Sequence, residues 1–109
     1  MYIGTTPTLP IEILGIDLTA AKVFLTIEDA AQRNQFTLTA PEDFTVTYDA
    51  EHDKTTGHVT LTQKQTLSIK AGQCRAQIRF IFADGSADAT NTVPVTFDDI
   101  LMKGVISYE

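Results

Sequence analysis

The feature that most constrains the fold is an alternation of apolar and polar residues along most of the chain. It is clearest over residues 21–28, where Val23, Leu25 and Ile27 are separated by Phe24 and Thr26. Residues 73–83 repeat the alternation over a longer run. A period of two places the apolar side chains on one face of a β-strand and the others on the opposite face. The chain is therefore expected to fold from strands that are buried on one face.

Shorter runs with the same period complete the pattern. They include the run from Leu9 to Ile13 and residues 34–39, 44–49, 58–62 and 87–97. Pro10 and Pro94 interrupt two of these runs, and proline is confined to edge strands or bulges because it lacks a backbone donor. Asp84-Gly85 predicts a tight hairpin. Residues 50–56 form a polar stretch that ends at Gly57 and is expected to be a loop. Residues 62–72 lose the alternation and predict a short helical turn, with Thr62 and Gln65 as its cap signal.

About seven strands, separated by turn residues every 8–12 positions, predict an all-β fold. We expect one domain over residues 1–109, with an immunoglobulin-like two-sheet antiparallel sandwich as its architecture. A small β-barrel is the alternative. Residues 98–109 follow the last predicted strand and are unusually apolar for a terminus. This segment is expected to dock either on its own domain or on a neighbouring molecule.

Composition argues against several classes of protein. The net charge of −6 and only eight scattered basic residues disfavour a surface that binds nucleic acid. No apolar run is long enough for a membrane-spanning helix, and the first residues lack the order of a signal peptide. We therefore expect a soluble protein made in the cytoplasm, without membrane insertion. Cys74 is the only cysteine and falls in a strand pattern, where it is expected to be a small buried side chain.

The chain contains no convincing catalytic or metal-binding motif. Residues 49–53 resemble the start of a calcium loop, but Lys54 stands where the loop needs glycine. His52 and His58 match no zinc-site spacing. The acidic pairs at 42–43 and 98–99 adjoin predicted strands, where aspartate commonly accepts hydrogen bonds from turn amides. We expect no enzymatic activity, no cofactor and no metal.

The sequence instead points to surfaces for protein contacts. Side chains of the strand over residues 73–83 that point outward form a stripe, and Phe24 is predicted to lie exposed on another strand. Aromatic and aliphatic residues beside arginine are typical of protein interfaces, although an ordinary solvated sheet face is the alternative. The candidate residues on this face are Phe24, Arg75, Gln77, Arg79 and Ile81, and those in the terminal segment are Ile100, Leu101, Met102 and Tyr108.

Four parts of the chain carry a family resemblance: residues 3–9, residues 16–23, the Asp84-Gly85 hairpin and residues 95–101. Together they resemble small prophage-encoded proteins of Gram-positive bacteria, which are similar to the immunoglobulin-like amino-terminal modules of phage baseplate upper proteins. Ala20 occupies a turn position where that pattern often has glycine. The resemblance implies a structural role in a phage tail or baseplate, with virion proteins or further copies of the chain as partners.

A carbohydrate-binding or adhesin-like module on the same sandwich is the alternative function. Sugar sites usually stack the sugar on exposed aromatic rings, and this chain has no tryptophan and three tyrosines. Specific binding on a glycan array would favour this alternative, whereas neighbouring genes for tail or portal proteins would favour the assembly role.

Overall fold

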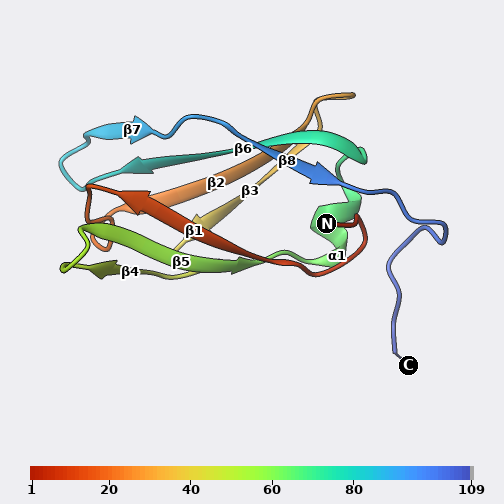
Figure 1. Ribbon diagram of the computed structural model, residues 1–109, viewed down its shortest axis with the longest axis horizontal. Helices are drawn as coiled ribbons and strands as arrows, with labels where there is room; N and C mark the ends of the chain where they lie inside the picture. The colour runs from red at the N-terminus through yellow and green to blue at the C-terminus, as the bar shows by residue number, and fades with distance from the viewer. Residues whose placement is uncertain (109) are drawn as a thin grey trace.

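The computed structural model describes residues 1–108, which form two antiparallel sheets stacked face to face (Figure 1). The elements in chain order are β1 (Thr8–Leu14), β2 (Lys22–Asp29), β3 (Gln35–Ala40), β4 (Val46–Asp49), β5 (Lys54–Thr60), α1 (Gln63–Leu67), β6 (Gly72–Ile81), β7 (Ala87–Ala89) and β8 (Val93–Phe97). The smaller sheet has the order β1-β5-β4. The larger has the order β3-β2-β6-β7, with β8 also paired to β6. This confirms the predicted all-β, two-sheet antiparallel sandwich.

The core lies between the two sheets and follows the predicted alternation. In β2 the side chains of Val23, Leu25 and Ile27 are buried, and they belong to one cluster with buried residues of the smaller sheet such as Ile11 and Val59. Removing this apolar surface from water is the main force that holds the two sheets together. Outward-facing threonines bridge neighbouring strands through their hydroxyl groups, as between β2 and β3.

The start of β5 differs from the prediction. Residues 50–56 were expected to form a loop that ends at Gly57, but β5 already begins at Lys54. Thr55 is buried, and its hydroxyl group is satisfied there: it accepts a hydrogen bond from the Leu18 amide at 2.9 Å and donates one to the Ile16 carbonyl at 2.7 Å. Gly57 lies inside the strand, where a Cβ atom would stand 2.8 Å from the Thr45 carbonyl oxygen. Glycine is needed at this position because the backbone at Thr45 approaches it closely, and not because the chain turns there.

The return strand predicted over residues 87–97 is split into β7 and β8, so the sandwich has eight strands in place of about seven. At the break, the Thr90 hydroxyl group accepts from the Ile78 amide at 3.1 Å, and the Gln77 side chain donates to the Thr90 carbonyl at 2.9 Å. Side-chain bonds therefore tie the break between β7 and β8 to β6. Pro94 lies in β8 at the edge of the sheet, as its type predicts.

The short connections follow their sequence signals. Gly85 has a φ of 90°, and its amide closes the hairpin after β6 on the Phe82 carbonyl at 2.9 Å. Thr62 and Gln65 form a reciprocal capping box that starts α1. Within residues 1–108, no helix is long and apolar enough to cross a membrane.

The N-terminus lies beside α1 and meets the chain just after β8 (Figure 1). Tyr2 and Asp98 form a parallel bridge, in which the Ile3 amide donates to the Asp98 carbonyl at 3.0 Å. The Asp98 amide in turn donates to the Met1 carbonyl at 2.6 Å. The first residues therefore cover the outer edge of the chain just after β8.

Candidate functional site

The outer face of the larger sheet brings together the five residues predicted on it. We call Phe24, Arg75, Gln77, Arg79 and Ile81 the outer-face cluster. The register of β2 against β6 places Phe24 opposite Arg79, and the next outward-facing pairs place Thr26 opposite Gln77 and Glu28 opposite Arg75. The cluster is therefore a continuous strip along two neighbouring strands.

The two arginines of this strip differ in their partners. Arg75 donates through Nε and Nη2 to Oε1 of Glu28, at 3.0 and 2.7 Å. Arg79 is exposed and has no ion-pair partner among residues 1–108. Phe24 was expected to be exposed, but it is half-buried because strands flank it on both sides. Arg79 and Ile81 thus remain the side chains of the strip that are most available to a partner.

The terminal segment forms a second, separate surface beyond β8 (Figure 1). Ile100 packs against the core of its own domain. By contrast, large apolar side chains beyond it are exposed to solvent, and these are Leu101, Met102, Val105, Ile106 and Tyr108. We call residues 101–108 the apolar tail. Predicted docking on the domain itself therefore holds for Ile100 but not for the apolar side chains of the tail.

Two polar contacts fix the course of this segment. The Gln63 side chain accepts from the Ile106 amide at 2.8 Å and donates to the Ile106 carbonyl at 3.2 Å. Asp99 accepts from Lys103 and from the Ile100 amide. The lysine bond and this amide bond hold the pKa of Asp99 below its ordinary value. The tail therefore leaves the domain past α1.

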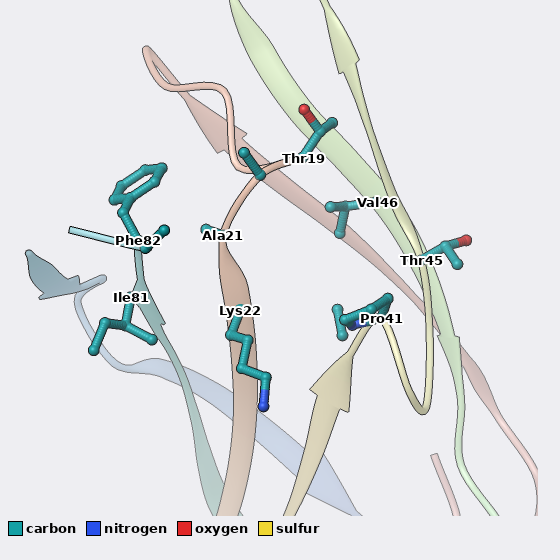
Figure 2. Close-up of a pocket in the computed structure, with 11 residues that line it drawn as sticks. Thr19, Ala21, Lys22, Pro41, Thr45, Val46, Ile81 and Phe82 are labelled. Carbon is teal, nitrogen blue, oxygen red and sulfur yellow. The ribbon is translucent and has the colours of Figure 1, made fainter. Parts of the chain in front are cut away.

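An open pocket of about 500 Å³ lies at one end of the sandwich (Figure 2). Its lining is mainly apolar and includes Ala21, Pro41, Val46, Ile81 and Phe82. Ile81 therefore links the outer-face cluster to this pocket. The 82–86 hairpin marks this end, which is opposite to the end that carries α1 and the tail (Figure 1).

A narrower groove of about 220 Å³ opens along one side of the sandwich, between β1 and the 90–95 segment. Its apolar lining comprises Leu9, Pro10, Ile11, Leu25, Ala76, Ile78, Val93 and Val95. We call it the β1/β8 groove. Sequence reasoning missed it, although the prolines in both bordering strands already predicted that these strands lie at sheet edges.

Two of the acidic side chains considered for chemistry, those of Asp49 and Asp43, accept hydrogen bonds from backbone amides. Asp49 accepts from the amides of Glu51 and His52 and contacts the His52 ring at 2.7 Å. Bonding to His52 is the main reason that the pKa of Asp49 is lowered. Asp49, Glu51 and His52 lie together in an exposed turn that these bonds explain. Asp43 likewise accepts from the Thr39 amide at 2.8 Å.

Cys74 is buried, as its place in the strand pattern predicted. Burial raises the pKa of its thiol, and the nearby carboxylate of Asp29 adds to this effect. Both effects favour the protonated thiol over the more reactive thiolate.

Comparison with known proteins adds no assignment, since no protein family, curated protein or solved structure matches the chain. Functional reasoning therefore rests on the surfaces described above. Two of them, the apolar tail and the outer-face cluster, expose apolar side chains beyond what the core of the domain uses.

Proposed function

We propose that the chain is a non-enzymatic structural or assembly module of a phage or prophage particle, in its tail or baseplate. It works through contacts with other protein subunits. The observation that supports this most strongly is the apolar tail, which exposes several large apolar side chains in sequence beside a well-packed core. Exposed apolar patches of this kind commonly mark surfaces that a partner covers.

The outer-face cluster supports the same proposal from another side of the domain. Arg79 keeps its charge exposed and lies beside Ile81, whose side chain is also exposed. Arginine next to aliphatic and aromatic residues is enriched in the centres of protein interfaces. A subunit with two such surfaces has the means to contact two neighbours in an assembly.

The proposal is tested by particle assembly in the phage or prophage that encodes the chain. Removal of the apolar tail, residues 101–108, is expected to block assembly of the phage tail or baseplate. The neighbouring subunit then loses the apolar side chains that it would cover. The matched control is Asp88→Asn, an exposed change on β7 outside both surfaces. Loss of assembled particles only with the truncated chain supports the proposal.

Normal particles from the truncated chain would contradict the role of the tail. A second measurement addresses the carbohydrate-binding alternative, because the intact chain can be applied to a glycan array. Specific binding of one glycan class, together with normal assembly of the truncated chain, would replace the assembly role with a carbohydrate-binding one.

A further inference from the structure

The outer face of the larger sheet is basic, although the chain as a whole carries a net charge of −6. Lys22 of β2 and two arginines of β6 point outward there, and Nε of Arg33 lies 4.0 Å from the carboxylate of Glu28 on the same face. The carboxylates that pair with these cations are those of Glu28 and Glu42. Within residues 1–108, four cations against these two carboxylates give the face a net charge of +2.

Arg79 is the cation of this face that has no carboxylate partner in the described part of the chain. Phe24 lies opposite it on β2, and together with Ile81 and Ala87 these side chains line a hollow of about 290 Å³. That volume is the share of roughly ten water molecules in the liquid, so a carboxylate side chain has room to reach Arg79. Apolar walls keep part of the water away, which strengthens an ion pair formed between them.

Negative charge gathers at the turn between β4 and β5, on the other sheet. We call residues 49–53 the acidic turn, since it contains Asp49, Glu51 and Asp53. The Tyr48 hydroxyl group donates to Asp53 at 2.5 Å. This bond raises the pKa of Tyr48, and burial and the charges of Asp53, Asp17 and Asp49 add to the effect. Glu51 is exposed in the middle of the turn, and within residues 1–108 its carboxylate has no hydrogen-bond or ion-pair partner.

The acidic turn and the outer face of the larger sheet cannot meet within one molecule. The turn joins two strands of the smaller sheet, and the core lies between this sheet and the larger one (Figure 1). The Gly15 amide donates to the Asp53 carbonyl oxygen at 2.7 Å and holds the turn to the end of β1. Both surfaces are thus formed in the free domain, and they face in different directions. Contact between them requires two molecules.

We propose that the acidic turn of one copy docks on the outer face of the larger sheet of a second copy, where the Glu51 carboxylate accepts from the Arg79 guanidinium group. Charge complementarity between two surfaces of one chain favours a second copy as the partner. This inference rests on the proposed function and identifies one contact of the assembly. The two surfaces differ, so the contact is heterologous and repeats from copy to copy into a closed ring or an open chain.

The test is sedimentation velocity over a range of concentrations in about 0.1 M salt, where the Debye length is ~10 Å and repulsion between whole molecules is largely screened. Arg79→Glu reverses the charge on the sheet face, Glu51→Arg reverses it on the turn, and a double variant carries both changes. Lys64→Glu is the matched control for Arg79→Glu, because it changes the net charge equally and lies exposed on α1. Circular dichroism of each variant establishes that its fold is retained.

The full chain and Lys64→Glu are expected to self-associate equally. Each single reversal at Arg79 or Glu51 replaces an attraction by a repulsion and is expected to weaken association about 10-fold. The double variant is expected to associate like the full chain, because it restores the pair with its charges exchanged. An equimolar mixture of the two single variants is also expected to associate, since each turn then meets a face of opposite charge. Raising the salt from about 0.1 to 1 M is expected to weaken association of the full chain.

Three outcomes overturn the inference. If the double variant and the mixture stay as weakly associated as the single variants, Glu51 and Arg79 do not form the contact. If association of the full chain is unchanged in high salt, charge does not hold the copies together. If the full chain stays monomeric at its highest soluble concentration, the second copy is not the partner. Removal of the apolar tail tests the proposed function separately, because the tail takes no part in this contact. A monomeric chain whose tail is needed for particle assembly would retain the proposed function.

Discussion

Asp29 offers the sharpest test of how the domain is held together. Its carboxylate is completely buried, at the junction between the turn after β2 and the segment that leads into β6. Oδ1 accepts from the amides of Gln32 and Arg33 at 2.6 and 3.0 Å, and Oδ2 accepts from the amide of Lys70 at 2.8 Å. One side chain therefore joins two segments that are far apart in the sequence.

Asp29→Ala removes the acceptor of three backbone amide donors, and its cost depends on what becomes of each donor. Arg33 keeps a second acceptor, because its amide also donates to the Asp29 carbonyl oxygen at 3.2 Å. The amides of Gln32 and Lys70 lose the acceptor described here, and each unpaired buried donor costs about 1–3 kcal/mol. Gln32 and Lys70 are exposed residues, so water can take up part of the lost hydrogen bonding at their amides. We therefore expect the free energy of unfolding to fall by about 3 kcal/mol, toward the lower part of the summed range.

Asp29→Asn separates hydrogen bonding from shape. It keeps one acceptor oxygen but turns an NH₂ group toward an amide donor, so it is expected to cost about half as much as the alanine change. The assay is equilibrium denaturation followed by circular dichroism. The control is Asp17→Asn, since Asp17 is exposed and bonds only within its own turn, to Thr19.

The pH dependence supplies a second readout of the same group. Burial acts to raise the pKa of Asp29, but the hydrogen bonds from Lys70, Gln32, Arg33 and Asn34 outweigh it, so the pKa lies below its ordinary value. A lowered pKa in the folded state stabilises the protein above the unfolded pKa of about 3.9, and this stabilisation is lost as the pH falls through the folded value. The stability difference between the parent and Asp29→Asn should therefore narrow below about pH 4.

Two results would refute this account of Asp29. One is a loss of less than about 1 kcal/mol on Asp29→Ala, which would mean that the amides find other partners. The other is a difference between the parent and Asp29→Asn that stays constant from neutral pH down to the acid transition. Either result would show that the Asp29 carboxylate does not stabilise the junction between the turn after β2 and the segment before β6.

Three further changes test the local structure by chemical denaturation. Thr55→Val keeps the shape but removes the buried hydroxyl group and should cost about 1–3 kcal/mol, whereas Thr47→Val on the exposed face of β4 should cost little. Gly57→Ala should lower the free energy of unfolding by about 1–3 kcal/mol, because the new methyl group meets the Thr45 carbonyl oxygen. An unchanged denaturation midpoint would show that the backbone shifts to make room for it. Thr62→Ala removes the helix cap and should cost about 1 kcal/mol, which Thr62→Ser should largely restore.

Local signals predicted much of the fold because they depend on neighbouring residues. Alternation located β2 and β6, and the Thr62 and Gln65 pair located the start of α1. Gly57 was expected to end a loop but lies inside β5, because its role depends on the Thr45 carbonyl oxygen just before the neighbouring β4. The split between β7 and β8 was also not predicted, because it rests on bonds between Thr90 and the distant β6.

The candidate surfaces were predicted unevenly for the same reason. Side chains on one strand share a face by parity alone, so the outer-face cluster was found as a group. Burial of Phe24 was misjudged, because it depends on which strands lie beside β2. The β1/β8 groove needs two edges from opposite ends of the sequence, so no local pattern reveals it.

We propose that the chain is a structural subunit of a phage particle, and quantitative mass spectrometry of purified particles measures whether it is one. The chain is expected in a fixed whole-number ratio to known tail or baseplate proteins, and this ratio is expected to survive repeated purification. Absence of the chain from intact particles, or trace amounts that vary between preparations, would rule this role out.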